Sequence, residues 1–282
     1  MKGIYKTGVF LTALFISTAM AAPQDWQKIK RPITGDPTPI GSYSNGCIIG
    51  AQALPSKGDG YQVIRLNRNR YYGHPDMISY LQRLGKKVKA AGMPTMLIGD
   101  IAMPGGGRFL TGHASHQMGL DADIWLRMGT MSDKDALNSD GKGLLVVNRS
   151  LQRVDDKLWN DNHANLIRLA AQDNQVSRIF VNPAIKLKLC QTVQGDRSWL
   201  QKIRPWFGHD SHFHVRLTCP PGAAYCENQA PVPAGEGCDA ELYSWFEPKK
   251  PSSEPAKPKV VPPEPFLCQQ VLNAPNRSEW LE

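Results

Sequence analysis

His212-Phe-His-Val-Arg-Leu217 alternates polar and apolar residues without a break. This alternation is typical of a β-strand with one buried face, because neighbouring side chains point to opposite sides of a sheet. The three apolar residues should face the core, and the two histidines and the arginine should share the other face. Residues two apart on a strand are separated by roughly 6–7 Å, so both imidazoles can serve one centre. With His209 nearby, a functional site is favoured over a pair of surface histidines.

A second cluster stands in Gly112-His113-Ala-Ser-His116-Gln-Met-Gly-Leu-Asp121-Ala-Asp123. The alternation from Leu120 to Leu126 places both aspartates on one face of a second strand. His116 lies in the glycine-containing loop that enters this strand, so its imidazole and a carboxylate can converge on one point. Two imidazoles and one carboxylate form the ligand set of a catalytic zinc whose fourth position is open to water.

Short blocks along the whole chain accompany this spacing of His116-x6-Asp123 and His212-x-His214. The blocks are Ser44-Asn-Gly-Cys-Ile48, Gly112-His-Ala-Ser-His116, Arg204-Pro-Trp-Phe207, His214-Val-Arg-Leu217 and Ser244-Trp-Phe-Glu-Pro248. Together they resemble the penicillin-insensitive murein endopeptidases. That family lies in the metallopeptidase superfamily that joins lysostaphin-type endopeptidases and D-alanyl-D-alanine peptidases.

The resemblance implies that His116, Asp123 and His214 bind zinc. It makes His212 the general base or electrostatic partner beside the metal, with His209 assisting. Zinc can lower the pKa of a bound water to about 7, and a neighbouring histidine can accept the proton and pass it to the leaving amine. We expect Asp121 to hydrogen-bond to one of the metal ligands and so to orient it. The alternative is that Asp121 is a solvated acid on the surface.

In the resembled family, His113 and Asp140 could belong to a second, peripheral metal site. Asp140-Gly-Lys-Gly143 has the composition of an exposed turn. Gly143 stands where a further imidazole would support that site, so we expect His113 to line the substrate cleft instead.

Residues 1–21 have the pattern of a cleavable signal peptide, with Lys2 and Lys6, a short apolar run and a small-residue cleavage site. The apolar run is too short to span a bilayer, so we expect export to the periplasm without stable membrane insertion. The net charge of +8 is spread thinly along the chain, which argues against nucleic acid as a partner.

All six cysteines lie after this segment, and an even number in an exported chain predicts three disulfides, for which 15 pairings exist. The resemblance proposes Cys47–Cys268, Cys190–Cys238 and Cys219–Cys226. Residues 247–282 are rich in proline, lysine and glutamate in their first half, which predicts an extended tail tethered by Cys268.

The elements favour a single α+β domain over residues 22–246, with a central antiparallel sheet that carries the zinc site and with flanking helices. Helices are predicted over residues 73–92, 160–175 and 182–190. Strands are predicted over residues 95–101, 120–126, 176–181 and 212–217.

By resemblance, the expected function is zinc-dependent hydrolysis of the D-alanyl–meso-diaminopimelyl cross-links of peptidoglycan, without inhibition by penicillin. The direct diaminopimelate link is a second candidate target. Two alternatives stay open: a zinc D,D-carboxypeptidase that trims terminal D-alanine, and a non-catalytic wall-binding protein. The expected partners are cross-link peptides, and a homodimer is compatible with the sequence.

Overall fold

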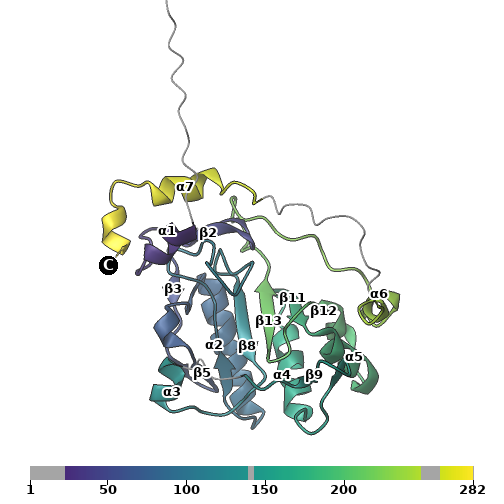
Figure 1. Ribbon diagram of the computed structural model, residues 1–282. Helices are drawn as coiled ribbons and strands as arrows, with labels where there is room; N and C mark the ends of the chain where they lie inside the picture. Colours follow the sequence, from purple (N-terminus) through teal and green to yellow (C-terminus); the bar gives the residue numbers. More distant parts are fainter. Residues whose placement is uncertain (1–22, 139–142, 249–260, 282) are drawn as a thin grey trace, which may run out of the picture.

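The computed structural model describes residues 23–138, 143–248 and 261–281. Its centre is a seven-stranded sheet (Figure 1). Across the sheet, the strands are β12 (Ile203–Pro205), β11 (Val176–Val181), β13 (His212–Leu217), β8 (Asp121–Trp125), β7 (Met96–Ile98), β5 (Tyr61–Val63) and β4 (Lys57–Gly58). The middle of the sheet is antiparallel as predicted, but β12 pairs with β11, and β5 with β7, in parallel. The sheet is therefore mixed, within the predicted α+β class.

Three helices pack on the apolar face of this sheet. They are α2 (Pro75–Ala90), α4 (Asp161–Ala171) and α5 (Pro183–Thr192), each shorter than or close to its predicted range. Their buried side chains form one core cluster with Phe213, Val215 and Leu217. Each helix begins at a residue whose side chain accepts a backbone N–H of the first turn, namely His74, Asn160 and Asn182. Polar caps and amphipathic spacing thus explain where the helices start and which side they bury.

The pairing of β13 with β8 fixes the opposite face. His214 lies across from Asp123, and Arg216 lies across from Asp121. Because side chains alternate along both strands, these four residues and His212 point away from the helices. The register therefore gathers the charged and imidazole side chains on one face, as the alternation predicted.

A smaller apolar cluster covers one end of the molecule. It joins α1 (Pro23–Lys28), the hairpin of β1 (Thr38–Ser42) with β2 (Asn45–Ile49), α7 (Phe266–Leu272) and the 3-10 helix η3 (Arg277–Trp280). The C-terminal segment consequently lies beside the N-terminal one (Figure 1). The predicted signal peptide and residues 249–260 of the tail lie outside the described residues.

The predicted disulfides are confirmed. Cys47 pairs with Cys268, Cys190 with Cys238, and Cys219 with Cys226. The first joins β2 to α7 and therefore holds the C-terminal segment against the hairpin. The remaining short elements are β3 (Gln52–Ala53), η1 (Leu66–Arg68), β6 (Tyr72–Gly73), α3 (Asp133–Leu137), β9 (Val147–Asn148), β10 (Arg153–Val154), η2 (Ser198–Lys202) and α6 (Ala240–Ser244).

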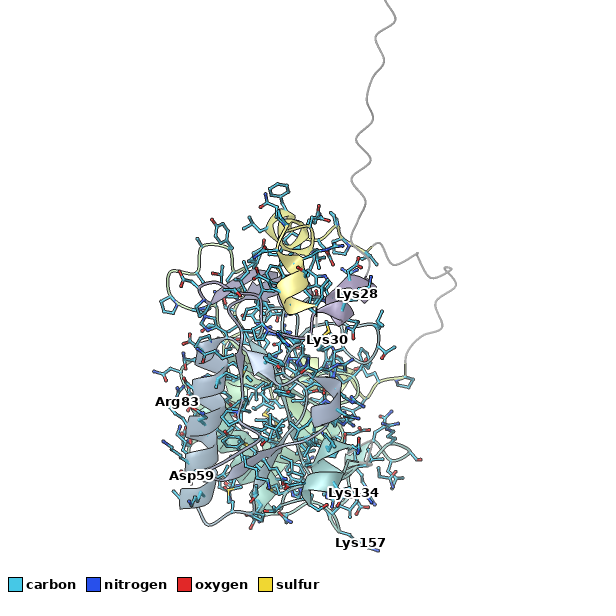
Figure 2. The ribbon with its side chains drawn as sticks, turned by 90° about the vertical axis from the view of Figure 1, so that its left-hand side faces the viewer. Lys28, Lys30, Asp59, Arg83, Lys134 and Lys157 are labelled. Atoms are coloured by element: carbon cyan, nitrogen blue, oxygen red, sulfur yellow. A yellow bond between two sulfur atoms is a disulfide. The ribbon has the colours of Figure 1, made fainter. Side chains whose placement is uncertain are left out.

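Lysines lie at both ends of the molecule. In Figure 2, Lys28 and Lys30 lie near the end that carries α1, whereas Lys134 and Lys157 lie at the opposite end. This distribution agrees with the thin spread of charge along the sequence. In the described part of the chain, no helix is both long and apolar enough to cross a membrane.

Candidate metal centre

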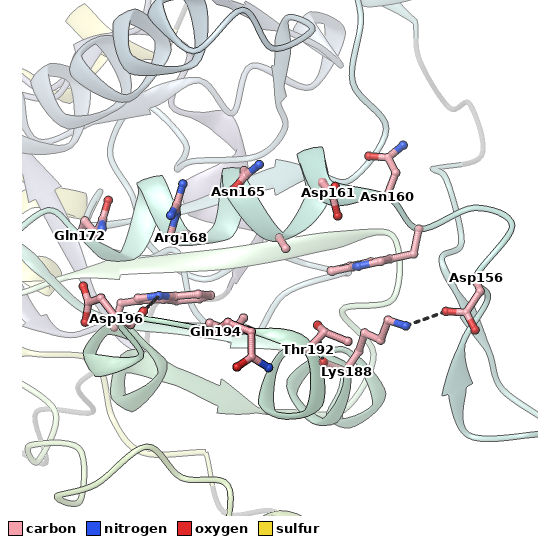
Figure 3. A pocket seen from close by; sticks show the side chains of 14 residues that line it. Asp156, Asn160, Asp161, Asn165, Arg168, Gln172, Lys188, Thr192, Gln194 and Asp196 are labelled. Carbon is pink, nitrogen blue, oxygen red and sulfur yellow. Dashed lines mark hydrogen bonds and ion pairs between the residues drawn. The ribbon is translucent and has the colours of Figure 1, made fainter.

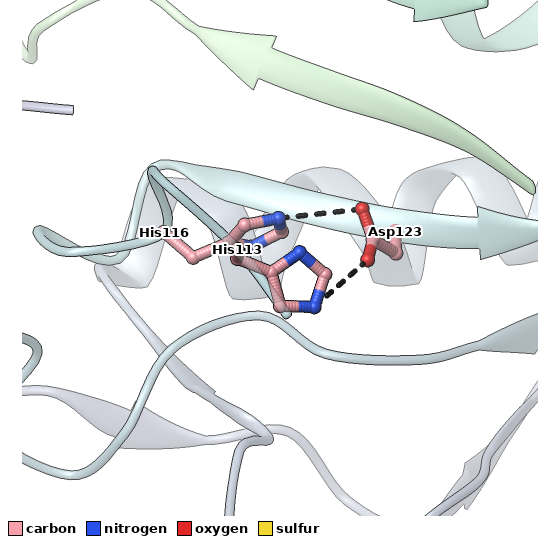
Figure 4. A group of neighbouring side chains, drawn as sticks. All are labelled: His113, His116 and Asp123. Atoms are coloured by element: carbon pink, nitrogen blue, oxygen red, sulfur yellow. Dashed lines mark ion pairs between the residues drawn. The ribbon is translucent and has the colours of Figure 1, made fainter. Parts of the chain in front are cut away.

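His113, His116 and Asp123 meet beside β8 (Figure 4). One ligand atom from each lies within 4.8 Å of the other two. His116 Nε2 is 3.3 Å from Asp123 Oδ1, and His113 Nε2 is 3.6 Å from Asp123 Oδ2. Imidazole nitrogen and carboxylate oxygen at such separations can hold a divalent cation.

The backbone around His116 is arranged to present its Nε2. The residue has a positive φ of 67° and is fully buried. Its backbone N–H donates to Asp121 Oδ2 at 3.0 Å, and its Nδ1 donates to the Ile101 carbonyl at 2.7 Å. A carbonyl only accepts, so Nδ1 carries a proton, and Nε2 is the nitrogen left to bind a cation in place of a second proton.

Strand β13 brings two further imidazoles to the same carboxylate. His214 Nδ1 lies 3.6 Å and His212 Nε2 lies 3.7 Å from Asp123 Oδ1. The ring centroids of His214 and His116 are 4.4 Å apart. Thus Oδ1 faces three imidazoles, whereas Oδ2 faces His113.

His209 lies at the edge of this group. Its ring centroid is 5.1 Å from that of His212, and its Nδ1 donates to the Phe207 carbonyl at 2.7 Å. His209 therefore borders His212 and makes no ion pair with Asp123 among the described residues. Asp140 lies outside the described residues, and a side chain placed on Gly143 would meet Ser211, whose Cβ is 2.7 Å from the added atom.

The site separates charged from neutral imidazoles. Burial and the Asp121 carboxylate act in opposite directions on His214, and burial prevails, lowering its pKa to about 3. Burial also lowers the pKa of His209, to about 4, with the neighbouring His212 adding to the effect. For His116, burial acts to lower the pKa, but Asp123 outweighs it and raises the value to about 9. His116 and Asp123 thus balance each other's charge as a buried ion pair.

A second buried carboxylate supports the ligands from behind. Asp121 Oδ1 lies 3.0 Å from His214 Nε2 and accepts from Arg216 Nε at 2.8 Å. Burial acts to raise the pKa of Asp121, but Arg216 and His214 hold it well below its usual range. Since Asp121 is only 1 % exposed, the alternative of a solvated surface acid is wrong.

Several buried polar atoms of the centre make no hydrogen bond within the described structure. They are His116 Nε2, Asp123 Oδ1 and His214 Nε2. The first two are 3.3 Å apart, and the third is 3.0 Å from Asp121, but none of these pairs is aligned for a hydrogen bond. Buried polar atoms are nearly always partnered, so Nε2 of His116 and Oδ1 of Asp123 fit a cation between them.

One contributor was missed in the sequence. Asp100 is 2 % exposed and accepts from Arg70 Nη1 at 2.9 Å, and its Oδ2 lies 3.0 Å from His113 Nε2. Burial acts to raise the pKa of Asp100, but His113 and Arg70 lower it to about 2. The residue falls within the apolar run predicted as a strand. A charged side chain in such a run was the available signal.

A groove of about 550 Å³ lies elsewhere, between α4 and α5 (Figure 3). It is lined by polar groups, including Lys188 and Asp156, which form an ion pair at 2.8 Å. Both helices pack on the sheet face opposite to the histidines. This groove therefore cannot present a substrate to the metal centre.

A family model described as penicillin-insensitive murein endopeptidase matches residues 39–273. The chain belongs to this family. A family member from Haemophilus influenzae is 75% identical over 284 residues, covering 100% of this chain and 99% of the relative. Relatives of the same name from Klebsiella pneumoniae strain 342 and Salmonella newport are 50% and 49% identical, each covering 95% of this chain and 97% and 98% of their own. The resemblance seen in the sequence is confirmed.

Proposed function

We propose that the protein is a zinc-dependent murein endopeptidase that hydrolyses D-alanyl–meso-diaminopimelyl cross-links of peptidoglycan. The observation that carries the proposal is the convergence of His116, His214 and His212 on one oxygen of Asp123, with buried ligand atoms that lack hydrogen-bond partners. The relatives are named as murein endopeptidases, and this supplies the substrate class.

The proposed ligands are His116 Nε2, Asp123 Oδ1 and His214 Nδ1. His113 is the nearest competitor for a place among them. Its Nε2 is 3.0 Å from Asp100 Oδ2 and faces the other oxygen of Asp123, so we assign it to the wall of the cleft. Two imidazoles and a carboxylate favour zinc among common divalent ions.

Zinc at these ligands would acidify a water and polarise the scissile carbonyl. The protein's own groups then handle the protons. His212 is 24% exposed at its side chain, so its Nε2 can accept the water's proton and return it to the leaving amine. His209 stays neutral at physiological pH because burial lowers its pKa, and its ring borders His212 without adding a second positive charge.

This chemistry involves no acylated serine. A β-lactam inhibits by acylating such a serine, and hydrolysis by an activated water offers it no target. Indifference to penicillin follows from the reaction class.

The setting proposed for this reaction is the periplasm. The disulfides among the described residues fit an oxidising compartment, and residues 1–21 have the pattern of a signal peptide. Peptidoglycan lies in the same compartment.

Digestion of purified murein tests the proposal. Zinc-loaded wild type should convert cross-linked muropeptide dimers to monomers, whereas the chelated protein and His212→Ala should leave dimers intact. Release of D-alanine without monomers would show a carboxypeptidase instead. Conversion by the chelated protein would contradict the metal-dependent reaction.

A further inference from the structure

A row of aromatic rings leads away from the metal centre. Phe180 meets His214 edge to face with centroids 5.3 Å apart, and Trp206 follows at 5.7 Å from Phe180. Trp245, at the end of α6, lies 6.2 Å from Trp206 and 4.8 Å from Phe207. The row therefore joins the loop before β13 to a helix far along the chain.

The outer part of this row is exposed to solvent. Trp206 is 51% and Phe207 is 59% exposed. Exposed, contiguous large apolar side chains on a protein surface usually mark a binding site. Here they are continuous with the catalytic face, so a ligand held on them would extend from the metal centre.

A groove of about 570 Å³ begins at these rings. Phe207, Trp245 and Phe246 line its aromatic side, and Arg149 and Gln152 line another part. Arg149 Nε donates to Asp210 Oδ2 at 2.6 Å, and Asp210 follows His209 directly. The groove wall is thus tied to the loop that carries the predicted assisting histidine.

We propose that this groove binds the N-acetylated aminosugar strand of murein while the attached peptide reaches the metal centre. The inference rests on the proposed function: the metal centre takes the peptide cross-link of murein, and the groove beside it takes the sugar strand of the same polymer. Pyranose rings present flat C–H faces that stack on indole and phenyl rings, and their N-acetyl groups exchange hydrogen bonds with polar side chains such as Gln152.

The charges of the groove favour a neutral sugar over a peptide arm. The side chains in the proposed cross-link are small or charged, whereas the groove offers large flat rings. Among the lining residues that the structure describes, Arg149 is the only cation and is already paired with Asp210, and Glu247 adds a carboxylate. Free peptide carboxylates would meet that negative charge, but an N-acetylated sugar would not.

Two substrates separate sugar binding from catalysis. Trp245→Ala should lower kcat/KM on intact sacculi about tenfold, mainly through KM, and leave cleavage of a sugar-free cross-linked peptide dimer within about twofold. Tyr243→Ala is the matched control, since it removes an exposed ring from the same helix outside the groove. An equal loss on both substrates, or no loss on sacculi, would overturn the proposal.

Direct binding keeps the test independent of cleavage. Titration of zinc-loaded His212→Ala protein with tetra-N-acetylchitotetraose should change its tryptophan fluorescence. A double variant that also carries Trp245→Ala or Trp245→Leu should bind this sugar about tenfold more weakly. If wild type cleaves neither substrate, the endopeptidase proposal fails, but the titration still shows whether the groove binds the sugar. Absence of binding to the His212→Ala protein would overturn the sugar assignment.

Discussion

Asp121 and Asp123 show how two carboxylates on one strand can have different tasks. Both are buried and both have a pKa held well below the usual range, against the effect of burial, by neighbouring cations. Asp123 faces the imidazoles, whereas Asp121 accepts from the His116 backbone N–H and from Arg216 and lies 3.0 Å from His214 Nε2. The role of each carboxylate depends on the residue that lies across from it on β13, which is His214 for Asp123 and Arg216 for Asp121.

Asp121→Asn should weaken both the fold and the metal site. Removing this charge leaves Arg216 buried beside an uncharged amide, which typically costs about 3–5 kcal/mol. Zinc affinity should fall about 10–100-fold, because the group that orients His116 and His214 is lost. Urea unfolding and a competitive zinc titration measure the two effects.

Asp156→Asn, which breaks an exposed pair with Lys188, is the control and should cost less than about 1 kcal/mol. Equal costs in the two variants would refute the role given to Asp121.

His113 and His214 differ in their expected effect on zinc. His214→Ala should abolish stoichiometric zinc binding, whereas His113→Ala should retain one ion per chain and lose activity only in part. The reason is that His113 is held by Asp100 and faces the oxygen of Asp123 that points away from the other imidazoles. Metal analysis after gel filtration gives the stoichiometry. The reverse pattern would place His113 among the ligands.

Among the secondary-structure elements, the sequence predicted those strands and helices whose position follows from alternating side chains or from capping residues. Strands β8 and β13 and the three long helices follow from local pattern, and with them the face that carries both aspartates and the two histidines of β13. The sequence did not reveal the two parallel pairings, β11 with β12 and β5 with β7, because pairing direction depends on connections between distant segments. The ring row from Phe180 to Trp245 has no local signature, since it joins segments far apart in the chain. Asp100 had a local signal, its charge within an apolar run, but its partner His113 could be found only from the fold.

Helix α5 carries a buried lysine that should make stability depend on pH. Lys186 is fully buried and donates to the Leu200 and Glu236 carbonyls, and burial lowers its pKa to about 7, from 10.5 when exposed. Between these values the unfolded chain binds one more proton, so this group raises stability as pH increases from 7. Each pH unit in that window is worth at most about 1.4 kcal/mol.

Urea unfolding at pH 7 and pH 9.5 measures this dependence. Wild type should gain stability relative to Lys186→Met over that interval. Lys188→Met, on the same helix, is the control for losing a lysine and should follow wild type. A Lys186→Met protein with the wild-type pH dependence would show that Lys186 does not titrate in this range.

At the scale of the whole molecule, the disulfides join segments that lie at very different separations along the chain. Cys47–Cys268 closes a separation of 221 residues and fixes α7 over the β1–β2 hairpin, whereas Cys219–Cys226 closes only 7. The family resemblance predicted which cysteines pair. The residues alone left 15 possibilities, because pairing follows the fold.

Replacing Cys47 and Cys268 together by alanine should lower the free energy of unfolding by about 5 kcal/mol on the chain-entropy model, against about 2 kcal/mol for Cys219 and Cys226. Zinc binding should persist, since neither cysteine touches the metal centre. Calorimetry and metal analysis of the two double variants test this. Loss of zinc from the first variant would show that the C-terminal segment supports the site.

The most direct measurement is anomalous diffraction at the zinc edge from crystals of the zinc-loaded protein. We expect one strong peak bound by His116, Asp123 and His214, with a coordination position open to solvent beside His212. A peak held by His113 and Asp100 without His214, or an ion fully enclosed by protein ligands, would contradict it.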